Sequence, residues 1–365
     1  MLKANRTLTA IDLFSGAGGL SLGLTKAGFK VLAAVEVNPK IAKTYMANHK
    51  HTKLIIRDIR DITGTDILQT IGSNKIDLVA GCPPCQGFCS LTTKYHKQDS
   101  RNELVLEMAR IIEEIDPHIV MMENVAGLAD RGKPILEEFI RRLEKKGYII
   151  NFKILQLADY GIPQSRRRFV LLAGKGFKIS FADPTHCRNG CKEKKLKPWL
   201  KLSDVILDME KPVTLSTALV NGGPKKFNWN VVRDLKKISI SRLESIKQGD
   251  SRKSLPDKLR PKCHVKSNEG FTNVYGRLSW DVVPPTITSG CLTPAMGRFG
   301  HPDELRTISV REAALIQTFP RKYIFDTDFI DTACDLVGNA LPPKFAEKTA
   351  VWCKNAFLAQ QSNSI

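Results

Sequence analysis

The sequence lacks the features of a membrane or secreted protein. No apolar run approaches the length of a membrane span, and no apolar signal segment stands near the N-terminus. The nine cysteines are odd in number and scattered, so no disulfide framework is indicated. No internal repeat or low-complexity tract appears. We therefore expect reduced thiols in a cytosolic or nuclear compartment, no membrane partner, and one large or two medium domains for 365 residues.

Acidic residues are the scarcer charge. There are 37 Asp and Glu against 56 Lys and Arg, which gives a net charge of +19 and favours a polyanionic partner. Residues 186–266 alone hold 20 Lys and Arg against 8 Asp and Glu. Such a run is usually a solvated face, but Trp199, Phe227 and Trp229 are interspersed in it. Basic and aromatic residues together favour a nucleic-acid surface.

The N-terminal third has the pattern of a nucleotide-type ligand site. A strand is predicted over residues 7–13, followed by the turn FSGAGG and helical spacing over 20–27. A second predicted strand, 31–35, ends in Glu36, 20 residues after Gly16, the spacing at which a carboxylate receives ribose hydroxyls. A third, 53–56, ends near Asp58 and Ile59. The glycine turn alone is weak evidence, but the set favours an adenosyl-type ligand, either a dinucleotide or S-adenosylmethionine.

The stretch KIDLVAGCPPCQGFCS (75–90) presents a candidate nucleophile. Residues 76–80 are predicted as a buried strand, and two prolines then fix the backbone just before Cys85. Three other interpretations are a small buried cysteine, a redox pair with Cys82, or a metal cluster with Cys89. No second Cys/His pair stands nearby to complete four ligands, and no redox-domain pattern follows. The nucleophile is therefore favoured.

The middle of the chain continues the alternation of strands and helices. The polar loop 91–102 precedes a helix over 103–116, and a strand over 118–122 has Glu123 and Asn124 at its carboxyl end. A helix is predicted over 134–146 and strands over 151–157 and 169–172. Three arginines precede the last strand, and alternation puts Arg166 and Arg168 on one side if they begin it.

A second domain begins where the composition changes, near residues 174–178. Cys187, Cys191, Cys263 and His264 have poor spacing for a zinc site, so free thiols are favoured there. Strand character resumes over 278–289. Helices are predicted over 310–317 and 344–359, and the last one needs a large apolar partner, for which the first domain's sheet is the candidate.

Eight blocks, in order, resemble the DNA cytosine-5 methyltransferases, particularly the bacterial restriction–modification type. They cover nearly the whole chain outside residues 175–275. Cys89 and Leu341 depart from the usual serine and valine. The blocks are DLFSGAGG (12–19), PCQGF (84–88), DSRNEL (99–104), ENV (123–125), QSRRR (164–168), RLSWDVVPPTIT (277–288), REAALIQTFP (311–320) and GNALPP (338–343).

The resemblance implies an α/β fold with a doubly wound, mostly parallel, Rossmann-like sheet. Residues 1–177, completed by the C-terminal helix at about 330–360, would form the catalytic and cofactor-binding domain. Residues 178–300 would form a smaller, basic target-recognition domain, and 301–330 a return segment.

The resemblance also implies the roles of individual residues. Cys85 would attack C6 of the cytosine, Glu123 would hold the base, Asn124 would orient the loop of Cys85 or Glu123, and Arg166 and Arg168 would contact the base, the nucleophile or phosphates. Gln86 and Gln164 would contact DNA, and no metal is implied. The cofactor would be S-adenosylmethionine, with S-adenosylhomocysteine as product. Its predicted site comprises Phe14, Ser15, Gly16, Gly18, Glu36, Asp58, Ile59, Pro84, Leu104 and Asn339.

The expected partner is double-stranded DNA, from which the target base is flipped out. The resemblance further implies a monomer in the bacterial cytoplasm, at the nucleoid, paired in function with a restriction endonuclease. Two alternatives differ in substrate or activity. A tRNA cytosine methyltransferase would carry a Cys-Phe-Thr signature and a short variable region, and neither is present. A silent DNA-binding homologue would have lost Cys85 or Glu123.

Overall fold

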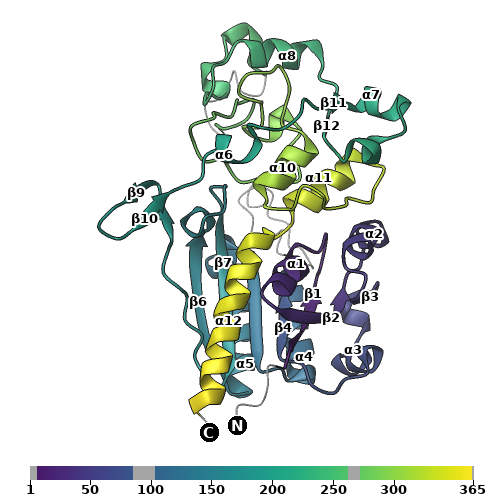
Figure 1. The fold of residues 1–365 in the computed structure, drawn as a ribbon, viewed down its shortest axis with the longest axis vertical. Helices are drawn as coiled ribbons and strands as arrows, with labels where there is room; N and C mark the ends of the chain where they lie inside the picture. The colour runs from purple at the N-terminus through teal and green to yellow at the C-terminus, as the bar shows by residue number, and fades with distance from the viewer. Residues whose placement is uncertain (1–5, 85–102, 262–271, 364–365) are drawn as a thin grey trace. The chain divides into compact units, whose positions relative to one another are not determined.

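The computed structural model describes residues 6–84, 103–261 and 272–363, which fall into two compact units (Figure 1). Unit 1 comprises the described residues of Met1–Leu157, Arg167–Pro184 and Leu341–Ile365. Unit 2 comprises those of Ala158–Arg166 and Thr185–Ala340. The C-terminal segment thus returns to the unit that contains the N-terminus.

Unit 1 is built on a seven-stranded sheet of order β3-β2-β1-β4-β5-β7-β6. Strands β1 to β5 run parallel, and β7 pairs antiparallel with both β5 and β6. The strands are β1 (Leu8–Leu13), β2 (Phe29–Val35), β3 (Lys53–Ile55), β4 (Leu78–Gly81), β5 (Ile119–Val125), β6 (Tyr148–Gln156) and β7 (Arg167–Lys175). Strands β1, β2, β4, β5 and β7 are mostly buried, as near-continuous apolar runs predict for a sheet covered on both faces, whereas the edge strands β3 and β6 are partly exposed.

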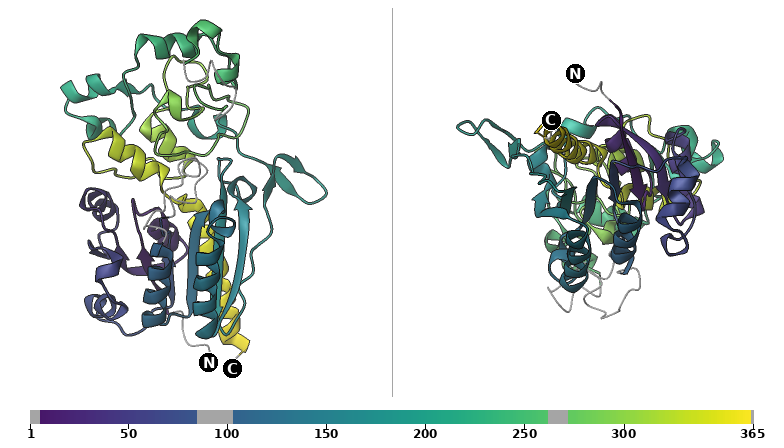
Figure 2. Two further views of the ribbon diagram at one scale, coloured as in Figure 1. Left: turned by 180° about the vertical axis from the view of Figure 1, so that it is seen from behind. Right: turned by 90° about the horizontal axis from the view of Figure 1, so that it is seen from below.

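Helices cover both faces of this sheet. Helix α12 crosses one face and α4 and α5 cover the other, as the front view of Figure 1 and the reversed view of Figure 2 show. Helix α1 packs closely on α12, because a Cβ added to Gly23 would lie 2.4 Å from Cβ of Ala346. The helices of unit 1 are α1 (Gly19–Lys26), α2 (Pro39–Asn48), α3 (Gly64–Ile71), α4 (Leu104–Ile115), α5 (Lys133–Lys145) and α12 (Pro343–Asn363).

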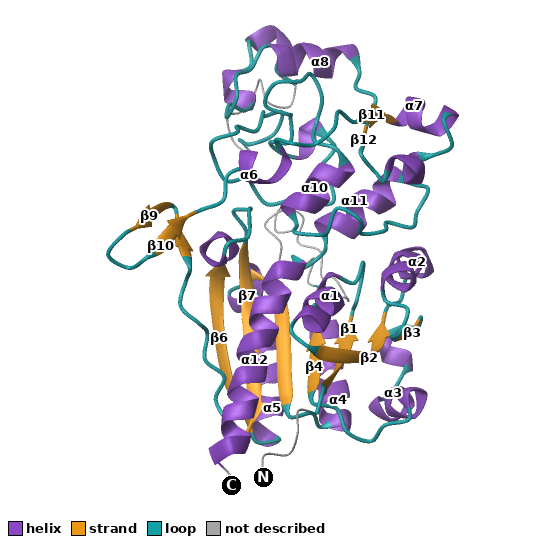
Figure 3. Ribbon diagram, viewed as in Figure 1, coloured by secondary structure: helices purple, strands orange, loops and turns teal. Residues whose placement is uncertain are grey.

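Unit 2 consists mainly of loops with short elements (Figure 3). Its strands are β8 (His186–Cys187), β9 (Asn189–Cys191), β10 (Leu196–Pro198), β11 (Val213–Thr214) and β12 (Val231–Val232). Its helices are α6 (Ser203–Ile206), α7 (Leu215–Val220), α8 (Lys237–Glu244), α10 (Val310–Ile316) and α11 (Ile330–Gly338).

The doubly wound α/β architecture predicted from the sequence is confirmed, with three corrections. Strand β5 extends to Val125, because antiparallel β7 continues the ladder through Glu123 and Asn124. Strand β7 begins at Arg167, so Arg166 precedes it and the expected alternation of Arg166 with Arg168 is wrong. Residues 278–289 form no strand. Two consecutive prolines interrupt that segment, and Pro285 makes only an isolated bridge with Ser165.

Two further features concern membranes and metals. Among the helices that the structure describes, none is long and apolar enough to cross a membrane. No three His, Cys, Asp or Glu side chains gather as a metal site within the described residues. The thiols of Cys187 and Cys191 are half-buried and outside any disulfide, and Cys263 and His264 lie outside the described residues.

Candidate active site

The carboxyl ends of the parallel strands bring most of the predicted site residues of unit 1 to one edge of the sheet. From β1 the chain winds outward to β2 and β3, and then returns to β4 on the other side of β1. The β1–β4 boundary is therefore the topological switch point, where open α/β sheets bind ligands. The glycine turn follows β1, and Pro84 lies three residues past β4. Cys85 and Gln86 lie outside the described residues.

The glycine turn has the backbone geometry of a ligand cradle. Phe14, Gly16 and Gly18 have positive φ angles of 60°, 53° and 86°, and a positive φ is strained for a residue with a side chain such as phenylalanine. The amide of Gly18 donates to the carbonyl of Ser15 at 2.8 Å. The Ser15 hydroxyl is buried and has no hydrogen-bond partner among the described residues. No atom lies within 4 Å of a Cβ added at Gly16, so the backbone there is open to a ligand.

Glu36 links the end of β2 to this turn. Its side-chain oxygens accept the amide of Gly16 at 2.9 Å and that of Asn38 at 2.8 Å. Burial raises the pKa of this carboxyl group. Each carboxylate oxygen can accept more than one hydrogen bond, so the group remains suited to bind a ligand hydroxyl while it fixes the turn.

Asp58 and Ile59 follow β3. Asp58 accepts from Nε of Arg60 at 3.0 Å and from Nη2 at 2.6 Å. This guanidinium lowers the pKa of the Asp58 carboxyl group, which is therefore ionised at neutral pH. Ile59 is buried, and Leu104 and Phe14 both pack half-buried against the same core. Apolar side chains thus accompany the polar groups, as an adenosyl ligand requires.

Glu123 and Arg168 form a charged pair across β5 and β7. Arg168 lies opposite Val125 in the ladder, which makes Glu123 its diagonal neighbour on the same face. Nε of Arg168 is 2.9 Å from Oε1 of Glu123. That oxygen makes no aligned hydrogen bond with any described residue. The carboxylate is therefore held electrostatically and can still accept hydrogen bonds from a substrate.

Asn124 connects β5 to the loop after β4. Its side-chain amide donates to the carbonyl of Pro83 at 3.0 Å, and its oxygen accepts the amide of Val125 at 2.7 Å. Both contacts lie in the buried sheet edge. The carbonyl that Asn124 fixes is two residues before Cys85, so Asn124 restrains the chain just ahead of the candidate nucleophile.

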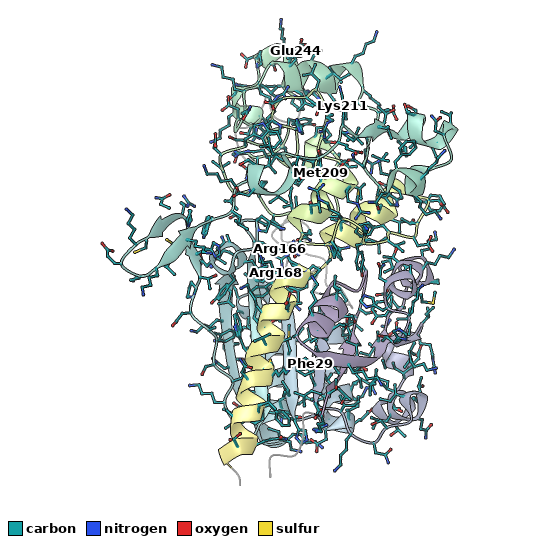
Figure 4. All side chains as sticks on the ribbon, in the orientation of Figure 1. Phe29, Arg166, Arg168, Met209, Lys211 and Glu244 are labelled. Atoms are coloured by element: carbon teal, nitrogen blue, oxygen red, sulfur yellow. The ribbon has the colours of Figure 1, made fainter. Side chains whose placement is uncertain are left out.

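Three predicted residues belong to unit 2. Gln164 is fully buried, donates to Oε1 of Gln317 at 2.7 Å and accepts the amide of Ile287 at 3.0 Å. Arg166, labelled with Arg168 in Figure 4, is buried and donates to the carbonyl of Ile287 at 2.9 Å. Asn339 directly follows α11. The structure therefore uses Gln164 and Arg166 to hold main chain within unit 2, and their contacts with DNA or the base stay predictions.

A buried polar cluster that was not predicted from the sequence lies next to the glycine turn. Asp12 in β1 accepts from the Ser21 hydroxyl at 2.6 Å, and the Tyr45 hydroxyl is 2.6 Å from the same Ser21 oxygen. Nε2 of His49 is 3.1 Å from the carbonyl of Gly18. The available signal was an aspartate inside an otherwise apolar predicted strand, because a buried carboxylate requires polar partners.

The unit 1 residues fit an adenosyl ligand on chemical grounds. Three polar features lie at the carboxyl ends of β1 and β2. They are the buried Ser15 hydroxyl, which has no partner among the described residues, the open backbone at Gly16 and the carboxylate of Glu36. Phe14, in the turn itself, and Leu104, at the start of α4, are half-buried apolar residues that pack against the core of unit 1. This combination provides polar groups for a ribose and an amino acid and apolar contacts for a base.

Similarity to known proteins agrees with this chemistry. A family described as C-5 cytosine-specific DNA methylase matches residues 8–355. The type II methylase M.HgiDII of Herpetosiphon aurantiacus is 36% identical over 338 residues, 91% of each chain. The type II methyltransferase M1.HphI of Haemophilus parahaemolyticus is 33% identical over 350 residues, 94% of this chain and 86% of its own length.

Two solved structures share the fold. A prophage-encoded protein of E. coli, assigned as a DNA modification methyltransferase, has a TM-score of 0.71 at 24% identity and covers 96% of this chain and 99% of its own. A DNMT2 mutant of Spodoptera frugiperda has a TM-score of 0.65 at 18% identity, covering 95% of this chain and 99% of its own. Fold, site chemistry and a family match over nearly the whole length agree: the chain belongs to the C-5 cytosine-specific DNA methylase family.

Proposed function

We propose that this DNA cytosine-5 methyltransferase acts through a covalent adduct between Cys85 and a cytosine flipped out of duplex DNA. The observation that carries the proposal is the hydrogen bond from Asn124 to the carbonyl of Pro83. It fixes the chain two residues before Cys85, beside the Glu123–Arg168 pair. A nucleophile, a carboxylate and an arginine thus come from neighbouring strand ends, as nucleophilic attack on a bound base requires.

The chemistry explains the need for a thiolate. C5 of cytosine is a poor nucleophile, so Sγ of Cys85 first adds to C6, and the electron pair of the former C5–C6 double bond makes C5 nucleophilic. When bound, S-adenosylmethionine supplies an electrophilic methyl group and leaves as S-adenosylhomocysteine. A base or water then removes the C5 proton, the thiolate is expelled, and the double bond is restored. A free cysteine with a pKa of about 8.5 is only about 3% thiolate at pH 7, so the surroundings must favour the thiolate.

Glu123 binds the base in this proposal. Its carboxyl group would accept a hydrogen bond from the exocyclic amine of cytosine and favour protonation of N3, while Arg168 holds the group from the side at 2.9 Å. Withdrawing electron density from the ring promotes thiolate addition at C6. The role of Arg168 is therefore to position Glu123, and Asn124 positions the Cys85 loop.

The cofactor would lie along the edge formed by the ends of β1, β2 and β3. Ser15, Gly16 and Gly18 would receive its amino-acid part and Glu36 its ribose hydroxyls. Asp58 and Ile59 would flank the adenine, and Phe14, Pro84 and Leu104 would complete the part of the site that unit 1 supplies. The buried Ser15 hydroxyl, which has no partner among the described residues, supports this placement because it is ready to hydrogen-bond a ligand.

DNA is the proposed target of the basic second domain, residues 178–300. The excess of 20 Lys and Arg over 8 Asp and Glu within 186–266 supports phosphate contacts. Flipping the base costs a few kcal/mol, which these contacts, Gln86 and Gln164 would offset. The names of the type II relatives support a modification role opposite a restriction endonuclease, by a monomer at the nucleoid.

The test is transfer of labelled methyl from S-adenosylmethionine to unmethylated duplex DNA, with bulk tRNA in parallel. Wild-type protein should label DNA, and bisulfite sequencing should map the target. Cys85→Ala should abolish labelling, at least about 10⁴-fold, while duplex binding persists. Cys187→Ala, which removes a half-buried thiol on β8 in unit 2, is the matched control and should retain activity.

Each outcome is informative. Turnover by Cys85→Ala would overturn the covalent mechanism. Label in tRNA alone would keep the catalytic assignment and replace the substrate, and label in neither would indicate a silent binding protein.

A further inference from the structure

Residues that flank both ends of helix α2 contact the glycine turn. Just before the helix, Glu36 accepts the amide of Gly16 at 2.9 Å and also the amide of Asn38, the residue that caps α2. Just after the helix, Nε2 of His49 lies 3.1 Å from the carbonyl of Gly18. The residues on either side of one ten-residue helix therefore hold the turn at Gly16 and Gly18, two residues apart.

The carbonyl that His49 contacts controls the start of α1. Gly18 is the N-cap of α1, with a φ of 86°, and its carbonyl also accepts the amide of Leu22 at 2.9 Å. Its amide donates to the carbonyl of Ser15 at 2.8 Å. The orientation of the Gly18 peptide therefore fixes both the turn and the first bond of the helix.

The imidazole of His49 acts as a donor in this contact. A carbonyl oxygen only accepts, so Nε2 must carry a proton. Burial lowers the pKa of His49 to about 4, so the ring is neutral at pH 7 and the proton resides on Nε2. The ring packs on Tyr45, with centroids 4.5 Å apart, which restricts its orientation.

Tyr45 continues the same support to β1. Ser21 has one hydroxyl proton and donates it to Asp12 at 2.6 Å, so the Tyr45 hydroxyl, 2.6 Å away, donates to Ser21. Asp12 and Tyr45 are both fully buried. The chain Tyr45–Ser21–Asp12 thus ties α2, α1 and β1 together under the turn.

We propose that His49 and Tyr45 are positioning residues that set the affinity for S-adenosylmethionine by holding the Gly18 peptide in its ligand-receiving orientation. The inference rests on the proposed cofactor site at the glycine turn. Neither side chain touches the reacting atoms, so each acts through Gly18 or Ser21. A backbone cradle binds well only when its peptides are oriented before the ligand arrives. Loss of the His49 donor should therefore weaken cofactor binding without altering the chemical step.

The experiment compares His49→Phe with wild type at saturating DNA. Phenylalanine keeps the aromatic packing on Tyr45 and removes the Nε2–H donor. We expect the KM for S-adenosylmethionine to rise about tenfold, with kcat and the KM for DNA within twofold. His49→Gln, whose amide can reach the Nε2 position, should recover most of the affinity. His51→Phe, an exposed histidine two residues further on, is the control and should behave as wild type.

Tyr45→Phe provides a second, milder variant. It removes one hydroxyl and leaves Asp12 paired with Ser21. We expect about a threefold rise in the KM for S-adenosylmethionine. Direct binding by isothermal titration should show the same order of variants without any turnover.

The outcomes separate this inference from the proposed function. A wild-type protein that neither binds S-adenosylmethionine nor methylates DNA would remove the proposed function itself. A wild-type protein that does both, with His49→Phe unchanged in KM, would refute the positioning role. A His49→Phe protein with a lower Tm, a reduced active fraction and an unchanged KM would show a purely structural histidine, which also refutes the proposal.

Discussion

The two units satisfy their backbone polar groups in different ways. In unit 1 the interior carbonyls and amides of seven strands pair with one another along the sheet. In unit 2 the strands have two or three residues each, so much of the buried backbone lacks a ladder. Buried arginines take over that role, because a guanidinium carries five donors in a fixed fork.

Arg277 and Arg311 show how this substitution works. Arg277 donates to the carbonyls of Leu243, His301, Pro302 and Glu304 at 2.8–3.1 Å. Arg311 is 2% exposed and donates to carbonyls of Asn228, Pro320 and Tyr323 at 2.8, 3.4 and 2.9 Å. Its guanidinium also lies 5.0 Å from the centre of the Phe325 ring. The basic residues of unit 2 therefore fall into two groups. Buried arginines such as these two bind backbone carbonyls, and most of the other Lys and Arg residues lie at the surface.

The largest expected effect is at Arg311, where a substitution tests whether buried arginines stabilise unit 2. Arg311→Met should lower the free energy of local unfolding in unit 2 by about 3–5 kcal/mol, because several buried carbonyls lose their donors together. Burial lowers the pKa of Arg311 only to about 10, so the lost group is a cation at neutral pH. Hydrogen exchange, resolved by peptide, should show faster exchange in unit 2 with little change in the strands of unit 1.

Lys211→Met is the matched control for Arg311. The Lys211 side chain is 83% exposed and pairs with Glu304 at 3.7 Å (labelled in Figure 4). It should change stability by less than about 0.5 kcal/mol. Equal effects of the two substitutions would mean that the arginine–carbonyl contacts do not stabilise unit 2.

Unit 1 should be most sensitive where its elements pack closest. Gly23→Ala would place a Cβ 2.4 Å from Cβ of Ala346 and 2.6 Å from the amide nitrogen of Glu347. Alanine favours a helix by about 1 kcal/mol over glycine, but two backbones would have to separate, so we expect a net loss of about 2–3 kcal/mol. Urea unfolding should show it. The control is Thr25→Ala, on the exposed face of α1, which should change the free energy of unfolding by less than about 0.5 kcal/mol. A Gly23→Ala protein as stable as wild type would show that α12 can shift.

The same contrast explains what the sequence could predict. Strand β1 was predicted over residues 7–13 and lies at Leu8–Leu13, because a fully buried strand is a continuous apolar run bounded by turn residues. Helices α1, α4, α5 and α12 were also predicted from the sequence, whereas α2 and α3 were not. The extension of β5 through Glu123 could not be predicted, since it depends on pairing with β7, about 45 residues further along the chain.

In unit 2 the informative signals were contacts between residues distant in sequence. In the sequence, Arg277 and Arg311 look like ordinary surface charges. Nothing in their neighbouring residues distinguishes them from Lys211. The segment 278–289 was predicted as a strand from its β-branched residues, but its prolines and its single bridge leave it irregular. At the site, the strand-end residues were predictable from motif and spacing. The support by Asp12, Tyr45 and His49 was not, because it depends on the packing of α2.

The smallest expected effect is on the pH dependence of stability, to which His49 and Asp12 contribute with opposite signs. Burial raises the pKa of Asp12 to about 7, so its folded carboxyl group destabilises unit 1 progressively as pH rises from about 4 to 7. His49 has the opposite sign. Its folded pKa of about 4 lies below the unfolded value of about 6.5, so its contribution is intact above pH 6.5 and is lost as pH falls toward 4. The two effects partly cancel in the wild-type protein.

His49→Gln removes one side of this balance. Between pH 7.5 and 4.5, wild type loses stability as the unfolded chain takes up a proton at His49, whereas the glutamine variant cannot. The variant should therefore gain about 2 kcal/mol relative to wild type at pH 4.5. Urea unfolding at both pH values measures the difference, and His51→Gln, at an exposed site, should show almost none. A flat difference for His49→Gln would mean that the imidazole is hydrated in the folded state, and that the Gly18 peptide is held by Glu36 and the main chain alone.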